Sequence, residues 1–544
     1  MPQQMKTGIQ GLDRVLEGGS LYHNSILIKG APGSGKTTLG IQIIYNGVAS
    51  YNEPGIVVLF EQFPQQLHRD LTAYEWDIER LEKEGKMTLI FARAEEALGK
   101  DQISDSLLVS QIHDAVVQTG ARRILIDSIS HLLNIIQPKM EHRELVLRFI
   151  NALKSIGLTP IFTAEQERES GAIGYEEYLT DCVLHLSNQA STDKTFPMRL
   201  LEVQKTRGHG HIRGRHPYRI GSKGIEVFPH VLPQSLEIDM NKEKIIKKIS
   251  TGITGLDEML GGGYVKGTST IIAGMPGTYK TTLCAQFLES GARQGDNGLF
   301  LTFNESPDFL VNVLEERGIP IRKHVANGTI RIRHFFPKTF YMDELLLLLD
   351  EELQSNSIQR IIIDGINDVE RSIEDPATYK DFMASLLAIL IRNNATALMT
   401  QKLDKFTSNA PLTDIRYAST VDGIIYLGTI ELESAVRKVI SVLKMRGGDY
   451  SGDLREITCG ANGLNVSDKF VGLSGILAGN PQGQYKKTVE EIFQPLYFVN
   501  DFLDVATTPG MEEQQKNEIL KSMKSEVGKL IERLKQYFDI EEKR

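Results

Sequence analysis

The chain has 544 residues, of which 41% are hydrophobic and 24% are charged, as in ordinary globular proteins. Its formal net charge of −9 argues against a dominant nucleic-acid-binding role, because contacts with phosphates favour a basic protein. No apolar run approaches the roughly 20 residues that a membrane span needs, and the 3 cysteines match no metal-ligand spacing. The N-terminal MPQQMKTGIQ contains no apolar signal segment, so we expect a cytoplasmic protein without a disulfide framework.

The first half of the chain returns in the second half as a series of blocks in the same order. TGIQGLDRVLEGG at 7–19 returns as TGITGLDEMLGGG at 251–263, and GAPGSGKTTL returns as GMPGTYKTTL. Further on, RILIDSIS and VQKTRG return as RIIIDGIN and VLKMRG. Such a repeat predicts two copies of one folding unit. We expect a first lobe at 1–228, a linker at 229–250, a second lobe at 251–470 and a helical tail at 471–544.

Strand-like and helix-like segments alternate along each lobe. Short apolar runs such as SILIKG and RILIDS are typical of strands that are buried on both faces. Between them, segments such as RELVLRFINALKSIG carry apolar residues at helical spacing. This alternation predicts the α/β class, with a mainly parallel twisted sheet covered by helices in each lobe.

A phosphate-binding loop (a Walker A motif, or P-loop) follows the run SILIK in the first lobe. Successive backbone N–H groups of such a loop wrap phosphates, its lysine reaches the terminal ones, and its hydroxyl binds Mg²⁺. Asp127 ends a later apolar strand, where a carboxylate that assists Mg²⁺ is expected. We predict that ATP and Mg²⁺ bind through Gly30, Gly33, Ser34, Gly35, Lys36, Thr37, Thr38 and Asp127, with Thr37 as the metal ligand.

The second loop differs at one position, where Tyr279 replaces the glycine that precedes the lysine. A tyrosine still supplies a backbone N–H, but it is strained if the position needs a positive φ. We predict a functional and modestly weakened site. Its residues are Gly277, Thr278, Tyr279, Lys280, Thr281, Thr282 and Asp364, with Thr281 as the metal ligand.

One carboxylate follows the next strand in each lobe, Glu61 in the first and Glu305 in the second. A carboxylate beside the γ-phosphate can orient and deprotonate the attacking group. Basic segments late in each lobe follow strands that would lie far from their own phosphate loop, so we predict that they act on a neighbouring subunit as arginine fingers do. These segments contribute Lys205, Thr206, Arg207 and His211 in the first lobe and Lys444, Met445 and Arg446 in the second. We predict direct catalytic roles for Lys36, Glu61, Arg207, Glu305 and Arg446.

The lobe openings, both phosphate loops, Trp76 with its flanks and HIRGRHPYRI resemble the KaiC family of double-lobed RecA-like ATPases across residues 7 to 480. The resemblance implies hexameric rings, ATP bound between subunits, slow hydrolysis, frequent self-phosphorylation in the second lobe, a KaiB-like protein partner, and a role in clock-like or stress signalling. Because the first loop is intact and the second carries Tyr279, we expect hydrolysis mainly in the first lobe.

The chain departs from that family in its second lobe. The family's acidic pair reads Asn304-Glu305 here, and its phosphorylated Ser-Thr pair aligns with Ala418-Ser419. An amide accepts no proton, so we predict weak autophosphorylation, with Ser419 as the preferred acceptor and Thr413 as a nearby candidate.

From Leu520 the tail has a heptad-like apolar seam, which continues at Met523, Val527, Leu530, Leu534 and Tyr537. It predicts either a short coiled coil that supports higher assembly of a ring or a helix that packs on its own domain. Two other functions stay open on the sequence: a RecA-like nucleic-acid-binding protein, and a nucleotide-switched scaffold without significant turnover.

Overall fold

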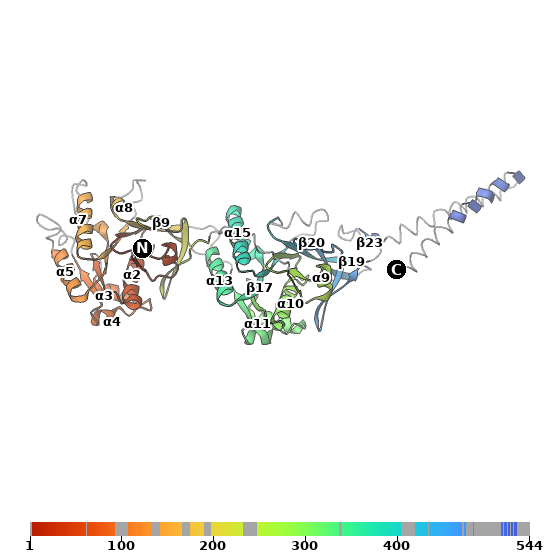
Figure 1. Cartoon of the computed structure of the whole chain (residues 1–544), viewed down its shortest axis with the longest axis horizontal. Helices are drawn as coiled ribbons and strands as arrows, with labels where there is room; N and C mark the ends of the chain where they lie inside the picture. The colour runs from red at the N-terminus through yellow and green to blue at the C-terminus, as the bar shows by residue number, and fades with distance from the viewer. Residues whose placement is uncertain are drawn as a thin grey trace. The chain divides into compact units, whose positions relative to one another are not determined.

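The computed structural model describes residues 3–60, 63–92, 107–131, 142–165, 175–189, 197–231, 247–336, 340–373, 375–403, 419–432 and 435–470, with short pieces as far as residue 529. The chain divides into two compact units. Each unit contains one nine-stranded sheet (Figure 1).

The first sheet has its strands in the order β11-β10-β9-β8-β3-β7-β6-β4-β5. The strands from β8 to β5 are parallel to their neighbours, and β8 to β11 are joined as antiparallel pairs. The bounds are β3 Ile26–Gly30, β4 Gly55–Leu59, β5 Met87–Phe91, β6 Arg123–Asp127, β7 Thr159–Glu165, β8 Cys182–Gln189, β9 Met198–Lys205, β10 Arg215–Gly221 and β11 Gly224–Val227.

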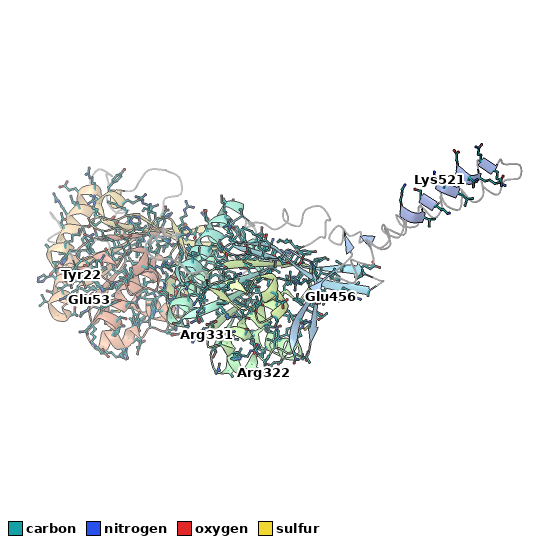
Figure 2. All side chains as sticks on the ribbon, turned by 45° about the vertical axis from the view of Figure 1, so that its right-hand side comes forward. Tyr22, Glu53, Arg322, Arg331, Glu456 and Lys521 are labelled. Carbon is teal, nitrogen blue, oxygen red and sulfur yellow. The ribbon has the colours of Figure 1, made fainter. Side chains whose placement is uncertain are left out.

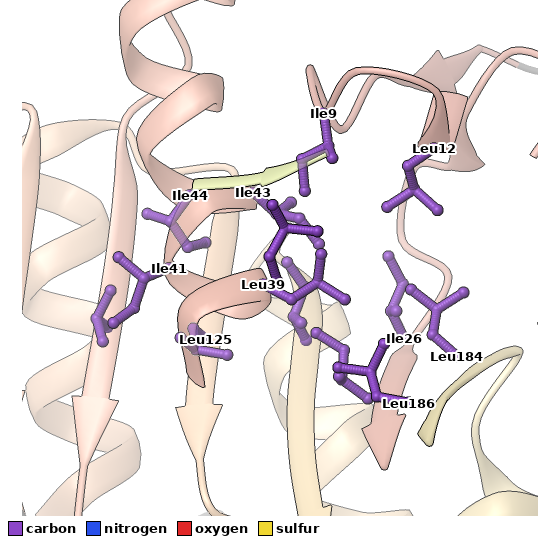
Figure 3. Packing of buried hydrophobic residues seen from close by; sticks show 14 of the residues in the cluster. Ile9, Leu12, Ile26, Leu39, Ile41, Ile43, Ile44, Leu125, Leu184 and Leu186 are labelled. Atoms are coloured by element: carbon purple, nitrogen blue, oxygen red, sulfur yellow. The ribbon is translucent and has the colours of Figure 1, made fainter. Parts of the chain in front are cut away.

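Helices cover both faces of this sheet. Leu39 and Ile43 of α2 belong to one apolar cluster, which also takes residues from α1, α3 and α4. Ile112 of α5 and Phe149 of α7 belong to another cluster. Figure 3 shows α2 side chains packed toward Leu125 and the neighbouring strands. The helices are α1 Leu12–Val15, α2 Lys36–Tyr51, α3 Pro64–Leu71, α4 Ile78–Lys83, α5 Leu107–Thr119, α7 His142–Ser155 and α8 Tyr175–Leu179.

The second sheet repeats the topology of the first, in the order β16-β15-β17-β18-β14-β19-β20-β21-β22. Its strands are β14 Ser269–Gly274, β15 Asn297–Thr302, β16 Ile330–His334, β17 Ile358–Asp364, β18 Thr396–Lys402, β19 Gly423–Leu432, β20 Ala435–Met445, β21 Arg455–Gly460 and β22 Gly463–Lys469. The helices along this half of the chain are α9 Thr254–Met259, α10 Lys280–Arg293, α11 Pro307–Glu316, α12 Arg322–Ala326, α13 Met342–Ser355, α14 Ile366–Arg371 and α15 Pro376–Arg392.

Short two-stranded pairs complete the secondary structure. They are β1 Gln4–Met5 with β2 Ser20–Leu21, β12 Lys248–Ile249 with β13 Tyr264–Val265, and β23 Leu473–Ser474 with β24 Gln482–Gly483. The described pieces between 513 and 529 are helical and include Lys521 (Figure 2). Met523, Leu530, Leu534 and Tyr537 of the heptad seam lie outside the described residues.

The predicted fold class is confirmed, because both units are mainly parallel α/β lobes of the RecA-like type and the tail contains helix. In parallel sheets the loops at the carboxyl ends of the strands form the binding edge. Here β3 and β14 both end directly at a phosphate loop, which places the candidate sites at this edge. Among the described residues, no helix is long and apolar enough to span a bilayer.

Candidate nucleotide-binding sites

The first phosphate loop connects β3 to the amino end of α2. A Cβ on Gly30 would lie 2.4 Å from the carbonyl oxygen of Leu186, so only glycine fits where the loop leaves the sheet. Gly35 adopts φ 92° and ψ 22° immediately before α2 begins. These two glycines let the loop turn tightly and direct the first free N–H groups of α2 toward its concave side.

Lys36 and Thr37 are the first residues of α2. The Lys36 ammonium donates to the carbonyl oxygens of Gly30 at 2.9 Å and Ala31 at 3.2 Å, so the lysine lies along the loop. Burial lowers the pKa of Lys36, although nearby carboxylates oppose this shift. The Thr37 hydroxyl donates to Asp127 Oδ2 at 2.9 Å, which joins the end of β6 to the loop.

The first loop has the features that a phosphate group with Mg²⁺ requires. The Ser34 hydroxyl is buried and has no hydrogen-bond partner among the described residues, and a Cβ on Gly33 would meet open space. Phosphate oxygens can satisfy such a hydroxyl together with the N–H groups of a helix amino end. Among the described residues no cluster of three or more His, Cys, Asp or Glu could hold a metal. The Thr37 hydroxyl with the Asp127 carboxylate nearby fits Mg²⁺, which keeps several waters and uses phosphate oxygens with few protein ligands.

The second loop has the same architecture despite Tyr279. Lys280 donates to the carbonyl oxygens of Gly274 at 2.9 Å and Met275 at 2.8 Å, and Thr281 donates to Asp364 Oδ2 at 2.8 Å. Thr278 donates to Met275 at 2.7 Å, so this hydroxyl has a partner within the loop, unlike Ser34.

Tyr279 occupies the left-handed region, with φ 71° and ψ 20°, at the position of Gly35 in the first loop. Because φ is positive here, Tyr279 carries the backbone strain that a non-glycine residue has in this conformation. The ring also packs against the buried core of the second lobe, and the Lys438 ammonium lies 3.5 Å above its centroid. Side-chain packing and a cation–π contact thus offset part of the backbone strain.

Of the two candidate bases, Glu61 lies outside the described residues. Glu305 is half-buried after β15, and burial together with the charge of Asp364 raises its pKa. Asn304 instead donates from its side-chain nitrogen to Asp368 Oδ2 at 2.7 Å. The amide is therefore used as a donor in a structural contact.

The basic segments lie away from the phosphate loop of their own lobe. In the first sheet Lys205 is opposite Val183, which is opposite Leu27 near the start of β3, whereas the loop follows the other end of β3. In the second sheet Lys444 is opposite Ile424, which is opposite Ile271 in β14. The antiparallel return of β9 and β20 therefore takes both segments to the amino-terminal edge.

Backbone carbonyls and an aspartate hold the first basic segment. Lys205 donates to the carbonyl oxygens of Glu177 at 2.8 Å and Thr180 at 2.6 Å, and burial lowers its pKa. Arg207 is 57% exposed, and its guanidinium lies 3.5 Å from Asp181 Oδ1. The Arg207 guanidinium is therefore accessible to solvent, while Lys205 holds the backbone of the segment in place.

The other residues predicted for these segments take several positions. Thr206 donates to the carbonyl oxygen of His209 at 2.8 Å, and its hydroxyl lies 3.1 Å from His211 Nδ1. Met445 is buried. The structure thus places Thr206 and His211 in the segment that follows β9, and Met445 in the core of the second lobe.

The second basic segment touches the predicted phosphorylation region. Arg446 donates to the carbonyl oxygen of Ser419 at 2.8 Å, and Lys444 donates to that of Val421 at 2.6 Å. Ser419 is exposed, and Thr413 lies outside the described residues.

Four loop neighbours were missed by motif reading. Tyr74 lies 3.3 Å from Thr38 through their hydroxyls, and Arg317 donates to Thr282 at 2.6 Å. The strand registers also place Glu165 opposite Gly30 and Lys402 opposite Gly274. Comparison of the two repeats position by position could have found the exchanges Tyr74/Arg317 and Glu165/Lys402, but it could not have shown that they touch the loops.

Comparisons with known proteins give consistent matches. The family model "ATPase: KaiC" matches residues 5–231 and 249–470. The Circadian clock oscillator protein KaiC of Synechococcus elongatus is 28% identical over 485 residues, which are 88% of this chain and 92% of the relative. The Circadian clock protein KaiC3 of a Synechocystis strain is 28% identical over 497 residues, which are 90% and 97%. The KaiC of Parathermosynechococcus lividus is 29% identical over 483 residues, which are 88% and 87%.

Proposed function

Because the chain belongs to the KaiC family of ATPases, we propose that it binds ATP with Mg²⁺ at both phosphate loops and hydrolyses ATP slowly, mainly in the first lobe. The observation that carries this proposal is the complete set of loop, lysine, threonine and strand-end aspartate in each lobe. We propose boundaries of 1–228 and 251–470 for the two lobes.

In the proposed reaction Lys36 would hold the β- and γ-phosphates, and the Thr37 hydroxyl, which donates to Asp127, would help to hold Mg²⁺. Bound Mg²⁺ would neutralise phosphate charge. Glu61 would orient and deprotonate the attacking water. In the second lobe Lys280, Thr281 and Asp364 take the corresponding places, and Glu305 is the available base.

We further propose that ATP lies between subunits of a homo-oligomeric ring. Support comes from the position of Arg207 and Arg446 in the sequence, because they follow strands that end at the sheet edge away from their own phosphate loops. A guanidinium that cannot act within its lobe can stabilise the γ-phosphate charge of a neighbour. The hexameric count, a KaiB-like partner, a cytoplasmic location and a clock-like or stress-signalling role are proposals that rest on the family alone.

Autophosphorylation in the second lobe should be weak. Asn304 cannot accept a proton, and its nitrogen already donates to Asp368. Ser419 is the acceptor that we propose for any remaining transfer, because it is exposed and lies beside Arg446. Labelling with γ-labelled ATP followed by peptide mapping tests this, and rapid stoichiometric labelling would contradict it.

The direct test of the main proposal is nucleotide occupancy and turnover. The chain purified with Mg²⁺ should carry about two nucleotides, because each loop has a complete phosphate-binding set. Lys36→Ala should lose one nucleotide and most of the hydrolysis, whereas Lys280→Ala should lose one nucleotide and keep most of the hydrolysis. Unchanged hydrolysis in Lys36→Ala would show that the first lobe is not the main catalytic site.

A further inference from the structure

The two phosphate loops have opposite charges beside their first residue. Glu165 ends β7 and lies opposite Gly30 in the register, whereas Lys402 ends β18 and lies opposite Gly274. A carboxylate therefore neighbours the first loop at the sheet position where an ammonium neighbours the second.

A second exchange lies over the first turn of the loop helices. In the first lobe the Tyr74 hydroxyl lies 3.3 Å from Thr38, and the Tyr74 ring stacks on Trp76 at 4.6 Å between centroids. In the second lobe the Arg317 guanidinium donates to Thr282 at 2.6 Å. A neutral phenol is thus exchanged for a half-buried cation at the amino end of α10.

Arg317 has no ion-pair partner in the part of the chain that the structure describes. No carboxylate of the described residues forms a salt bridge with it, although the charge of Arg317 lowers the pKa of Glu305 against the effect of burial. The amino end of α10 already favours anions through its free N–H groups and its dipole. A guanidinium at this place therefore adds to a field that attracts phosphate.

We propose that Arg317 and Lys402 supply at the second loop part of the positive charge that Mg²⁺ supplies at the first, so that the second site retains a nucleoside di- or triphosphate without a divalent cation. This inference rests on the proposed binding of nucleotide at both loops.

Arg317 and Lys402 each place a positively charged side chain beside the second loop. Charge-assisted hydrogen bonds from Arg to phosphate are stronger than neutral ones, and screening by water is reduced where the guanidinium is half-buried. The first site has neither cation, and Glu165 there repels phosphate. The positive charge of Arg317 and Lys402 would also compensate for the strain that Tyr279 places on the second loop.

The test counts nucleotide per chain with Mg²⁺ and again after dialysis against EDTA. The full chain should fall from about two nucleotides to about one. In EDTA the retained nucleotide should be absent from Lys280→Ala and present in Lys36→Ala. Loss of both nucleotides from the unmodified chain in EDTA would overturn the inference.

The double variant Arg317→Tyr/Lys402→Glu gives the second loop the residues of the first. Its ATP affinity in EDTA should fall on the order of 10- to 100-fold, as expected for losing charge-assisted bonds, and by a smaller factor in Mg²⁺. A matched control is Arg322→Tyr/Lys323→Glu, which makes the same charge change on exposed residues of α12 away from the loop (Arg322 is labelled in Figure 2). Equal loss in both double variants would contradict a local effect.

For the reciprocal variant Tyr74→Arg/Glu165→Lys we expect a gain of nucleotide binding in EDTA, which a misfolded protein could not produce. The variant should let the first site retain nucleotide in EDTA, which raises the count to about two. No gain in a variant that still binds two nucleotides with Mg²⁺ would count against the inference. Absence of nucleotide with Mg²⁺ in the unmodified chain would instead refute the proposed function.

Discussion

At the scale of single residues, Tyr279 shows how a phosphate loop tolerates a side chain at a glycine position. Its backbone keeps the left-handed conformation that Gly35 has in the first loop. An L-residue with a Cβ costs about 1–2 kcal/mol in that conformation. The ring packs on the second-lobe core beneath the Lys438 ammonium, which recovers part of this cost. Loop geometry and side-chain packing are therefore coupled at this residue.

Truncation of Tyr279 separates these two effects. Tyr279→Ala keeps the backbone strain and removes the packing, so we expect it to destabilise the second lobe by about 1–2 kcal/mol. Tyr279→Gly relieves the strain and removes the packing, so its net change should stay within about 1 kcal/mol. Denaturant unfolding of the two variants measures the difference. An alanine variant as stable as the glycine variant would show that the conformation carries no strain.

Glu305 gives the second site a pH dependence. Burial and the charge of Asp364 raise its pKa above the ordinary glutamate value of 4.5, so the protonated form persists to higher pH. A base must be deprotonated, so turnover that uses Glu305 should be lost as the pH falls through this raised pKa.

Single-turnover hydrolysis by Lys36→Ala, in which only the second site is intact, measures this profile. Arg317→Tyr should move the inflection to higher pH, because the charge of Arg317 lowers the pKa of Glu305. Glu305→Gln should remove the inflection. A profile that Glu305→Gln leaves unchanged would assign the base to another group.

At the scale of secondary-structure elements, a buried arginine anchors the strand that ends in Asp127 or Asp364 in each lobe. Arg123 begins β6 and donates to Glu53 at 2.7 Å, and Arg360 in β17 donates to Asp296 at 2.8 Å. Arg123 also donates to the carbonyl oxygen of Lys6 at 2.8 Å. The arginines thus tie the lobe openings, the loop helices and the central strands together.

Glycines in the loop helices make room for these arginines. A Cβ on Gly47 of α2 would lie 2.8 Å from Arg123 Nε, and a Cβ on Gly291 of α10 would lie 2.3 Å from Arg360 Nε. The close approach of helix and guanidinium explains why glycine interrupts two otherwise apolar helices.

Removing the acid of each pair should destabilise the two lobes unequally. Glu53 is 10% exposed and also accepts from the Tyr22 hydroxyl, which lies near it in Figure 2. Glu53→Ala leaves the fully buried Arg123 charge without its partner, so we expect a loss of about 3–5 kcal/mol. Asp296 is 30% exposed, so water can enter the space that Asp296→Ala leaves beside Arg360, and this variant should cost less.

Thermal unfolding of the two variants, with each lobe followed separately by hydrogen exchange, measures the losses. Glu82→Ala is a control, because it removes a carboxylate whose ion pair among the described residues is with a histidine, His68, and not with a buried arginine. A Glu53→Ala loss no larger than that of the control would show that the buried pair contributes little.

At the scale of the whole molecule, the repeat gives two sites that share one chemistry and differ in charge. The sheets have the same strand order, and both return a basic segment to the edge away from the phosphate loop. In the arrangement that we propose, the basic segment of each lobe would act at the phosphate loop of a neighbouring subunit.

Mixing two inactive variants tests this arrangement. Arg207→Ala lacks the guanidinium and Glu61→Gln lacks the base, and each should hydrolyse ATP at a small fraction of the normal rate. If Arg207 acts across a subunit boundary, mixed rings contain interfaces with both groups intact, and activity should recover in part. Steady-state ATPase rates after subunit exchange measure the recovery. Rings that have exchanged subunits and stay inactive would place Arg207 within its own site or outside catalysis.

The sequence alone determined the repeat, the α/β class, the two phosphate loops and the strand-end aspartates. These features are local, because a loop motif and the spacing of apolar residues are read within a few turns of chain. The same reading left the effect of Tyr279 open, since the φ of a residue depends on the loop around it. The structure resolved it with a φ of 71° and a packed ring.

The tertiary structure decided which distant residues meet. Strand register places Glu165 and Lys402 beside the loops, and the residues that follow α3 and α11 bring Tyr74 to Thr38 and Arg317 to Thr282. Antiparallel pairing of β8 with β9 takes Arg207 to the far edge of its sheet. Such contacts join segments that are tens to hundreds of residues apart, and only the pairing of strands and the packing of helices specifies them.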